Sequence, residues 1–414
     1  MRDQSAVPND GLMQVRKKIA WLIPRLVEGS GGIRTMLAYA KGLESAGYEC
    51  LLYIEGVGGD KQARADVQHH FSYFFKHVQY GWENIAPADM VIATIWYSAR
   101  IVRDLPFSCR KVYLVQDREA LFYPAGYESL MAEQSYLYGL IPITVGYWLK
   151  TELQKRHGVP AYALDFGVDN QVYRRQEEVQ PEQAVCFIYQ PDKPRRCARL
   201  GIDALGIVKH HAPDTQIYLY GSHRSESRQI WFQHTHMGLI SPDECNTLYN
   251  KCRVGLCLSA SNPSRVPFEM AAAELPVVEI WKGNMLYDFR ESMGLLCEPT
   301  PESIAEGILT ILKNRHRDPM TVAQNIRQQP AINEVQGFLV AINRVMEGRV
   351  PSAEDIPQRY STPIITASPE TACLPVDVAR RVNAPGNAGL NRLHPVLRKL
   401  LGWGARMVRT RLLN

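Results

Sequence analysis

The feature that most constrains the fold of this chain is a regular alternation between apolar, strand-like runs and amphipathic, helical runs. The first strand-like run begins at Lys18 with KIAWLIP, and a glycine-rich turn at 28–32 separates it from a helical pattern over 33–46. Gly47 ends that pattern, and the next strand-like run, YECLLYI, starts at Tyr48. This order of strand, glycine turn, helix and strand is typical of a βαβ unit, in which the two strands lie parallel.

The alternation continues in two series. The first series has strand-like runs over 90–95, 111–116 and 141–145 and helical patterns over 98–105, 127–138 and 148–157. The second has strand-like runs over 184–189, 216–220, 254–258 and 275–280 and helical patterns over 196–209, 242–251, 268–274 and 301–313. Continuous apolar strands are typical of parallel sheets that helices cover on both faces. We therefore expect an α/β protein with two Rossmann-like domains that face a cleft.

Interruptions of the alternation indicate the domain boundaries. A polar, proline-containing segment follows Asp165, and the segment after Arg349 is rich in Pro, Ser, Thr and Ala. Such composition is typical of linkers. The expected parts are a disordered N-terminus at 1–17, Rossmann-like domains at 18–170 and 171–348, a flexible linker at 349–390 and a basic amphipathic helix at 391–414.

Composition and residue spacing disfavour several classes of protein. Hydrophobic residues make up 46% of the chain and charged residues 21%, which is typical of a globular protein. The nine cysteines include no CxxC pair, and most sit singly in apolar runs, so we expect reduced thiols in a cytoplasmic protein. No run approaches the roughly 20 apolar residues of a membrane span, and the N-terminus has no apolar signal core. The histidines show no ligand spacing, so we expect no metal.

The net charge of +5 is concentrated in the C-terminal tail. From 378 to 414 there are eight Arg and Lys and no Asp or Glu, so the rest of the chain holds 39 basic and 42 acidic residues. This weakly acidic body argues against a nucleic-acid-binding surface on it.

The tail also has an amphipathic helical pattern. Leu397 and Trp403 fall on its apolar face, and Arg398, Lys399 and Arg406 fall on its basic face. We expect such a helix to bind an anionic membrane surface, which would place the protein peripherally at the inner face of the plasma membrane. Two alternatives stay open: the helix docks on the body of the protein, or it binds nucleic acid.

Two loops after predicted strands offer binding groups for an anion. Gly31 and Gly32 stand between a strand and a helix, where glycine lets a backbone approach a ligand closely. Lys193, Arg195 and Arg196 follow the first strand of the second domain, where they could neutralise a phosphate-bearing leaving group. The alternatives are a tight turn without a ligand and a solvated basic loop.

A third loop joins the strand that ends at Leu258 to a helix that begins near Pro267. We expect the backbone N–H groups of 266–269 to meet a diphosphate. Glu269, in the first helical turn, could accept hydrogen bonds from sugar hydroxyls, or it could only complement the helix dipole. The loop contributes further polar candidates: Ser259, Asn262 and Ser264.

Two carboxylates follow a strand of the first domain. Asp117 and Glu119 stand beside Gln116 and near Phe122 and Tyr123, at the edge where α/β folds bind ligands. They could bind an acceptor or act as a base. The alternative is that an Asp–Arg contact merely holds the loop.

Several segments resemble those of known glycosyltransferases. GGIRTMLAYAKGLESAGYEC resembles the opening of GT-B glycosyltransferases. LDFGVD, LYGS, and the run from GLISPDECNTLYNKC to PFEMAAAELPVV resemble C-terminal signatures of glycosyltransferase family 4. VQDREALFYPAGY, PDKPRR and NPSRVPFEMAA resemble the WsaF-like rhamnosyltransferase branch. The resemblance covers 18–315.

The resemblance implies a nucleotide-sugar donor in the C-terminal domain and an acceptor in the N-terminal domain. Glu269 matches the second glutamate of the family's E-x7-E motif, whereas Ser261 stands at the first, which the WsaF-like branch also lacks. Gln190 stands where that branch often has arginine, so phosphate neutralisation would depend more on the loop cations. The implied catalytic residues are Asp117, Arg196 and Glu269. Gln116 and Glu119 are implied on the acceptor side. The implied donor-binding residues are Gly31, Gly32, Lys193, Arg195, Gly221, Ser259, Asn262, Ser264 and Pro267.

The expected function is transfer of a sugar from a nucleoside diphosphate to a growing bacterial surface polysaccharide such as lipopolysaccharide. The resemblance implies a deoxyhexose such as rhamnose, with dTDP-rhamnose as co-substrate, an oligosaccharide or lipid-linked glycan as acceptor, retention at the anomeric carbon, and no cofactor or metal. Two alternatives stay open: a nucleotide-sugar 2-epimerase, and a non-catalytic sugar-nucleotide-binding or scaffold protein of the same fold.

Overall fold

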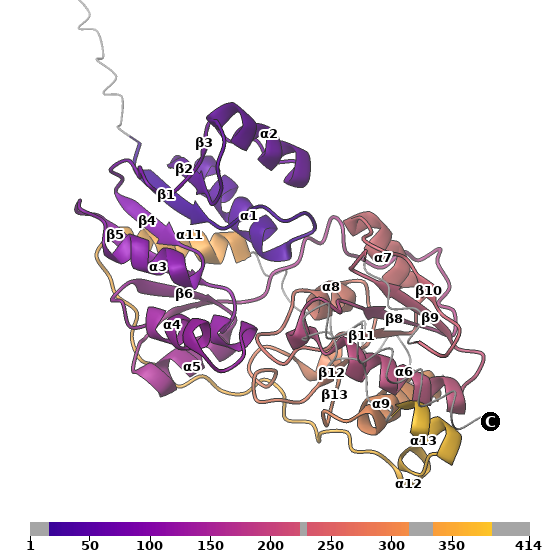
Figure 1. Cartoon of the computed structure of the whole chain (residues 1–414). Coiled ribbons are helices and arrows are strands. Elements are labelled where there is room, and N and C mark those ends of the chain that lie inside the picture. Colours follow the sequence, from indigo (N-terminus) through magenta and orange to yellow (C-terminus); the bar gives the residue numbers. More distant parts are fainter. Residues whose placement is uncertain (1–15, 224–229, 314–333, 383–414) are drawn as a thin grey trace, which may run out of the picture.

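The structure is a computed structural model that describes residues 16–223, 230–313 and 334–382. It contains two parallel β-sheets, each covered by helices on both faces, and the two sheets lie side by side along the molecule (Figure 1). The two Rossmann-like domains expected from the sequence are therefore present.

The N-terminal sheet has seven parallel strands in the order β3-β2-β1-β4-β5-β6-β7. The strands are β1 (Lys18–Ile23), β2 (Glu49–Ile54), β3 (His77–Tyr80), β4 (Met90–Ala93), β5 (Arg110–Val115), β6 (Ile141–Val145) and β7 (Tyr162–Leu164). The helices are α1 (Gly31–Ser45), α2 (Asp60–Phe71), α3 (Trp96–Arg103), the short 3-10 helix η1 (Glu119–Phe122), α4 (Tyr127–Ser135) and α5 (Tyr147–His157).

Strand β1 shows why its sequence is apolar at every position after Lys18. Trp21 packs into the core beneath α1, whereas Leu22 packs into a second core beneath α3 and α5. Because successive side chains of a strand point to opposite faces, a strand covered on both sides needs apolar residues on both.

The C-terminal sheet has six strands in the order β10-β9-β8-β11-β12-β13. The strands are β8 (Ala184–Ile188), β9 (Gln216–Tyr220), β10 (Thr235–His236), β11 (Val254–Leu256), β12 (Val277–Ile280) and β13 (Gly294–Cys297). The helices are η2 (Pro194–Arg196), α6 (Ala198–His211), α7 (Pro242–Lys251), α8 (Val266–Ala272), η4 (Glu291–Met293) and α9 (Pro301–Lys313). Like the first sheet, it is parallel throughout, so its carboxyl-end loops share one edge.

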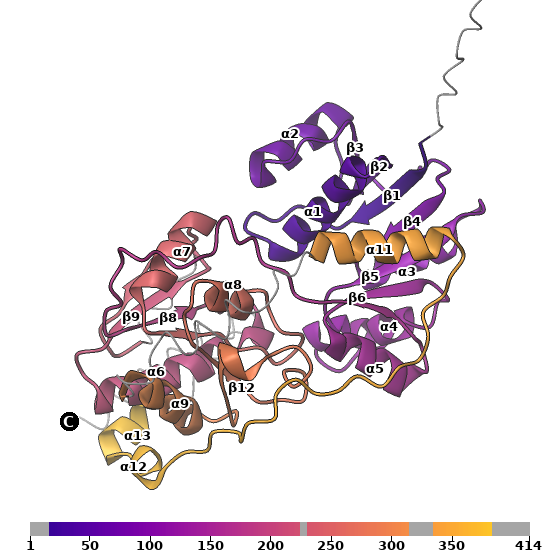
Figure 2. The ribbon, with the colours of Figure 1, turned by 180° about the vertical axis from the view of Figure 1, so that it is seen from behind.

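One helix from the C-terminal part of the chain belongs to the N-terminal domain. Helix α11 (Glu334–Met346) lies along the N-terminal sheet in the view from behind (Figure 2). Phe338 stacks on Tyr39 of α1 with ring centroids 4.4 Å apart and lies 5.7 Å from the ring of Trp21. The expected boundaries of the C-terminal domain, 171–348, are thus corrected. The last helix of that range, α11, packs on the N-terminal domain because its apolar face fits beside α1.

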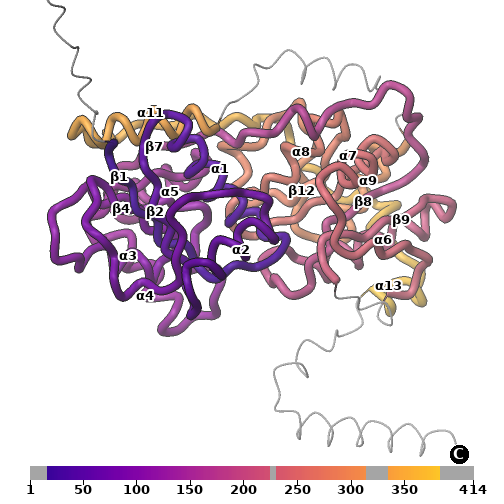
Figure 3. The backbone as a smooth tube through the Cα atoms, turned by 90° about the horizontal axis from the view of Figure 1, so that it is seen from above, coloured from indigo at the N-terminus to yellow at the C-terminus, as the bar shows by residue number. Residues whose placement is uncertain are grey.

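The segment expected to be a flexible linker at 349–390 is also corrected for its described part, 349–382. It returns to the C-terminal domain, where α12 (Pro369–Ala372) and α13 (Val376–Val382) lie at the end of the molecule farthest from α11 (Figure 3). Tyr360 is buried there, Ile365 forms a β-bridge with Cys297, and Val378 packs in the core of α6 and α9. These apolar side chains anchor a segment whose overall composition is that of a linker. Residues 1–15 of the N-terminal tail predicted at 1–17, and the whole tail helix predicted at 391–414, lie outside the described residues.

Candidate functional site

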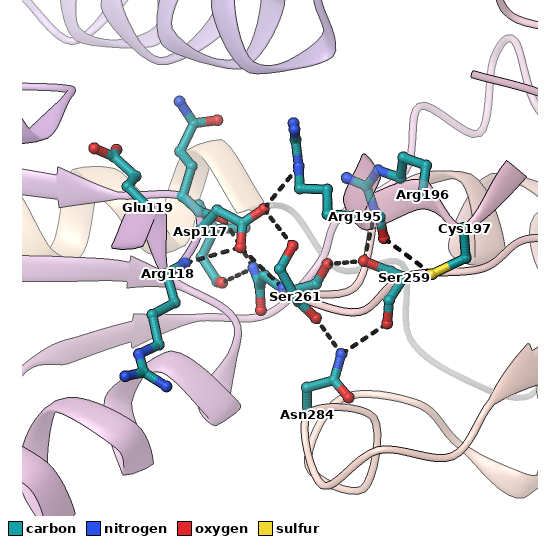
Figure 4. Close-up of polar contacts among 12 residues, drawn as sticks. Asp117, Arg118, Glu119, Arg195, Arg196, Cys197, Ser259, Ser261 and Asn284 are labelled. Atoms are coloured by element: carbon teal, nitrogen blue, oxygen red, sulfur yellow. Dashed lines mark hydrogen bonds and ion pairs between the residues drawn. The ribbon is translucent and has the colours of Figure 1, made fainter. Parts of the chain in front are cut away.

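Asp117 lies at the junction of the two domains, in the loop after β5. Its side chain is buried, and both carboxylate oxygens accept hydrogen bonds. Oδ2 accepts from Ser261 Oγ at 3.0 Å, and Oδ1 accepts from the backbone N–H of Asn262 at 2.9 Å and of Arg118 at 2.8 Å (Figure 4). Two of these three donors belong to the C-terminal domain, so Asp117 connects the sheets.

Asn262 completes this connection from the opposite side. Its Nδ2 group donates to the carbonyl oxygen of Gln116 and to that of Val145, both at 2.9 Å. Those carbonyls belong to the ends of β5 and β6, so one buried amide joins the C-terminal loop to two adjacent strand ends. Ser261 and Asn262 therefore hold the domains together, and both residues are buried.

The predicted cationic loop lies directly beside Asp117. Arg195 Nε is 3.7 Å from Asp117 Oδ2, and Arg196 Nη1 donates to Ser259 Oγ at 2.7 Å. Burial, and after it the charges of Arg195 and Arg196, lower the pKa of Lys193 to about 8. Burial also lowers the pKa of Arg195, and the charge of Arg196 lowers it too, whereas the charges of Asp117 and Glu119 act in the opposite direction. An anion bound here would relieve the mutual repulsion of the three cations.

Asp117 has an electrostatic environment that suits proton transfer. Burial raises the pKa of Asp117, while Arg196, Arg195 and the hydrogen bonds from Asn262 and Ser261 oppose that rise. A carboxylate whose pKa is raised towards neutrality is a stronger base than an exposed one.

The other acceptor-side candidates have structural partners. Glu119 is buried, which raises its pKa to about 8, and its Oε2 accepts from the backbone N–H of Trp96 at 2.6 Å, at the start of α3. Its side chain points away from Asp117 in the close-up (Figure 4). Gln116 Nε2 donates to the carbonyl oxygen of Gly32 at 3.3 Å. The Asp–Arg contact considered as an alternative for this loop is made by the backbone N–H of Arg118, whereas the Arg118 side chain pairs with Glu133 at 2.9 Å.

Two buried side chains that the sequence analysis did not select hold the loop after β11. Glu279, at the end of β12, accepts from the backbone N–H of Ser259 at 2.8 Å, and burial raises its pKa to about 8. Asn284 Nδ2 donates to the carbonyl oxygens of Ser259 and Ser261. The signal that could have identified Glu279 is an acidic residue inside an apolar strand run.

Glu269 faces both domains from α8. Burial raises its pKa to about 7, against the charges of Arg265 and of Arg34 on α1 and a hydrogen bond with Tyr173. It thus lies close enough to Arg34, on the helix that begins at the glycine turn, for the two charges to interact. Gly31 has open space around its Cα hydrogens, whereas an added Cβ on Gly32 would be 3.6 Å from the Gln116 side chain.

The backbone N–H groups expected to meet a diphosphate at 266–269 already have acceptors. The N–H of Val266 donates to Ser264 Oγ at 3.1 Å, and those of Phe268 and Glu269 donate to the Arg265 carbonyl oxygen at 3.0 Å. Position 267 is a proline, which has no N–H. This expectation is therefore corrected: Ser264 lies before α8 and accepts the hydrogen bond of its first N–H group, and Pro267 is the second residue of the helix.

Two further candidates differ in detail from their expected positions. Arg196 does not begin helix α6, which starts at Ala198; it lies in the preceding 3-10 turn, η2. Gly221 has a left-handed φ of 96° and accepts a hydrogen bond from Gln190 Nε2 at 3.1 Å through its carbonyl oxygen. An added Cβ there would be 3.0 Å from Ile188, so glycine is required both by φ and by packing.

Arg265, which the sequence analysis also did not select, connects α8 to the N-terminal domain. Its Nη2 donates to Glu334 Oε1 of α11 at 2.5 Å, and its Nε donates to Thr35 Oγ1 of α1 at 2.9 Å. Tyr39 donates to the same glutamate. Arg265 directly precedes α8, the helix that carries Glu269.

Within 16–223, 230–313 and 334–382, no group of His, Cys, Asp or Glu is arranged to hold a metal ion. No helix in those same ranges is both long enough and apolar enough to cross a membrane. The predicted membrane-binding residues Leu397, Arg398, Lys399, Trp403 and Arg406 lie outside them.

Sequence comparison connects the C-terminal half to a known family. Residues 183–309 match the family model described as WsaF, C-terminal domain. Over 232 residues the chain is 30% identical to O-antigen biosynthesis protein RfbC of Myxococcus xanthus. That match covers 55% of this chain and only 18% of the relative's length.

Solved structures share the fold of the described chain. Alr3699/HepE of Anabaena, crystallised with UDP, is similar with a TM-score of 0.62 and 15% identity over 80% of this chain and 100% of that one. WaaG, a glycosyltransferase involved in lipopolysaccharide biosynthesis, is similar with a TM-score of 0.56 and 12% identity over 80% of this chain and 100% of that one. The chain therefore has the GT-B glycosyltransferase fold, and its residues 183–309 match the model of the WsaF C-terminal domain.

Proposed function

We propose that this protein transfers a sugar from a nucleoside diphosphate donor to a growing bacterial surface polysaccharide. The observation that carries the proposal is the crowding of Lys193, Arg195 and Arg196 beside Asp117 at the domain junction. Three partly buried cations on one loop favour a polyanion, and a diphosphate leaving group is the polyanion that sugar transfer produces. The relationship to an O-antigen biosynthesis protein and to a WsaF domain supports the polysaccharide as product.

In the proposed mechanism each domain has a separate task. Lys193, Arg195 and Arg196 neutralise charge as the bond between sugar and diphosphate breaks. Glu269 accepts hydrogen bonds from donor hydroxyls. Asp117 takes the proton of the acceptor hydroxyl after exchanging its present hydrogen bonds for substrate contacts. Contact between the domains excludes water, which favours transfer over hydrolysis.

Further details of the substrate follow from the resemblance to the WsaF-like branch. We propose a deoxyhexose such as rhamnose, carried by dTDP, transferred with retention at the anomeric carbon. A related fold binds UDP and UDP-glucose in Alr3699/HepE, so the choice of base is a question for direct measurement. We also propose that the protein works at the cytoplasmic face of the membrane, where lipid-linked acceptors are elongated.

The test is calorimetric titration with UDP and dTDP, followed by product analysis with the matching sugar nucleotides. Replacing Lys193 by Met should weaken nucleotide binding about ten- to a hundredfold, because a charge-assisted contact is lost. Lys251→Met is the matched control, because Lys251 ends α7 just before β11 and so lies at the opposite edge of the sheet. Absence of nucleotide binding by the wild-type protein would overturn the proposal.

Incubation with donor alone separates the alternatives. A fold of this kind also occurs in a putative UDP-N-acetylglucosamine 2-epimerase of Listeria monocytogenes, with a TM-score of 0.54. An epimerase would convert the donor without any acceptor, and a scaffold protein would bind it without turnover. We expect neither: new glycosidic product should form only when an acceptor glycan is added.

A further inference from the structure

Four aromatic side chains form a continuous row at the carboxyl edge of the N-terminal sheet. Ring centroids are 5.7 Å apart between Trp82 and Tyr97, 5.3 Å between Tyr97 and Trp96, and 6.2 Å between Trp96 and Tyr123. These residues follow β3, β4 and β5 in the chain. Because the strands are parallel, the row shares its sheet edge with Asp117.

Each ring of this aromatic row is fixed by a hydrogen bond at its polar end. Trp82 Nε1 donates to the carbonyl oxygen of Tyr53 at 2.9 Å, and Trp96 Nε1 donates to the Tyr123 hydroxyl at 3.0 Å. The Tyr97 hydroxyl donates to the carboxylate of Glu55 at 2.7 Å. All four rings are only half-buried. The aromatic row is thus a rigid apolar surface, and its order before binding lowers the entropic cost of holding a ligand.

Glu55 adds a hydrogen-bond acceptor beside these rings. Both of its hydrogen bonds, from Tyr97 and from the backbone N–H of Arg25 at 3.1 Å, fall on Oε2. Oε1 accepts none from any residue that the structure describes. An apolar ring surface next to a carboxylate matches a sugar, which has an apolar face of C–H groups and a rim of hydroxyl donors.

The aromatic row leads towards the proposed reacting groups. Tyr123 follows Phe122, whose ring centroid is 4.1 Å from the guanidinium carbon of Arg195 in the other domain. Glu119 fixes the backbone at Trp96, so the loop that carries Asp117 and the start of α3 are held together. A chain lying on the aromatic row would therefore present its end to the domain junction.

We propose that Trp82, Tyr97, Trp96, Tyr123 and Glu55 form the subsite for the acceptor glycan, and that its sugar rings stack on the aromatic row. The proposal rests on the proposed function, since it takes the junction to be the place of transfer. It assigns the ligand as carbohydrate, not as the alkyl part of a lipid-linked acceptor, because the Glu55 carboxylate would be desolvated by a lipid chain without compensation.

The test measures nucleotide binding and sugar binding on the same variants. The probes are dTDP and UDP for the donor side, and methyl glycosides of di- and trisaccharides of rhamnose, glucose and galactose for the acceptor side. Binding of the methyl glycosides is followed by intrinsic tryptophan fluorescence and by calorimetry. Trp82→Leu and Trp96→Leu should each weaken oligosaccharide binding about tenfold or more, whereas Trp82→Phe and Trp96→Phe should retain most of it. Nucleotide affinity should stay within about twofold, which also shows that the variants are folded.

Three results would overturn the inference. They are no binding of any of these oligosaccharides to the wild-type protein, equal binding by the Leu variants, and displacement of the sugars by a decyl phosphate probe at lower concentration. Failure of the proposed function itself is seen separately, as absence of nucleotide binding in the wild-type protein. Tyr97→Phe, which removes only the hydrogen bond to Glu55, should alter the preference among the three sugars more than the affinity for dTDP.

Discussion

Ser261 Oγ lies 3.0 Å from Asp117 Oδ2, so the position where the family motif would have its first glutamate donates a hydrogen bond to a carboxylate of the other domain. A glutamate at 261 would place two buried carboxylates together, which raises the free energy of the ionised pair. Serine at this position is therefore compatible with an aspartate that reaches in from β5. Ser261 is thus part of the junction between the two domains.

Replacing Asp117 by Asn should lower transfer to the acceptor about a hundredfold or more, because the proposed proton acceptor is removed while the side-chain shape is kept. Donor affinity should change much less. The measurement is kcat and KM for the acceptor beside calorimetry with the donor nucleotide.

Ser261→Ala is the matched control for this variant. It removes one hydrogen bond to the same carboxylate but leaves the base in place, so its loss should be tenfold or less. Equal losses in transfer and in donor binding for Asp117→Asn would show that Asp117 only holds the two loops together.

Glu269→Gln should weaken transfer about ten- to a hundredfold without unfolding the protein, because a charged acceptor of donor hydrogen bonds becomes neutral. The pKa of Glu269 is raised to about 7 by burial, so the ionised fraction of the wild-type carboxylate increases as the pH rises through that value. Activity should rise as pH increases through about 7 in the wild type. A pH–rate profile of the variant that keeps the same rising limb would assign the limb to another group.

Nucleotide affinity should fall as pH rises above about 8, because burial lowers the pKa of Lys193 to that value and the deprotonated amine no longer attracts phosphate. Bound diphosphate should itself raise the pKa of Lys193, which moves the fall to higher pH in the complex. Calorimetry at several pH values, in buffers of different ionisation enthalpy, measures the proton uptake. In Lys193→Met the alkaline fall should disappear.

Arg196→Ala should reduce donor affinity and turnover together, by about ten- to a hundredfold, since its charge is assigned to the diphosphate before and during bond breakage. Because Arg196 also holds Ser259 through a 2.7 Å hydrogen bond, thermal unfolding is measured on the same variant. Unchanged donor affinity and turnover in this variant would instead assign the contact with the diphosphate to Arg195 and Lys193.

Removing one partner of the Arg265–Glu334 pair should destabilise the protein by about 3–5 kcal/mol, because an unpaired charge is left in a largely buried place. Arg265→Met and Glu334→Leu are the single variants, and the double variant should lose less than either one. Urea unfolding measures all three. Additive losses in the double variant would contradict the idea that the two side chains stabilise the junction as a pair.

The long periodic elements and the general place of the site could be predicted from the sequence. Strands such as β1 and β8 carry continuous apolar runs, whereas β7 with three residues and β10 with two carry too little pattern to detect. Sequence also placed Asp117 and Arg195 at the ends of strands in different domains, and the parallel topology brings them together.

The sequence could not predict which partners distant in the chain each element packs against. Nothing local in α11 says that Phe338 stacks on Tyr39 and not on the C-terminal sheet. The same local reasoning predicted that the backbone N–H groups of α8 would bind an anion, but these groups donate hydrogen bonds to Ser264 and Arg265. The sequence analysis did not select Arg265 and Glu279, because the residues that they contact are distant in the chain.

The described structure determines where a truncation can test the proposed membrane role of the tail. A cut after Arg349, at the start of the expected linker, would remove buried Tyr360, the bridge at Ile365 and helix α13 from the C-terminal domain. That protein should unfold at lower temperature. A cut after Val382 keeps these contacts and removes only the basic tail.

The shorter truncation should keep nucleotide affinity and thermal stability while it loses binding to vesicles of anionic lipid. Each basic residue near such a surface contributes about 1 kcal/mol, so binding of the full chain should weaken as salt is raised. Co-sedimentation with vesicles that contain phosphatidylglycerol measures it, and vesicles of neutral lipid are the control. Undiminished sedimentation of the protein cut after Val382 would place the membrane contact on the folded domains, and a loss of stability in that protein would show instead that the tail docks on its own body.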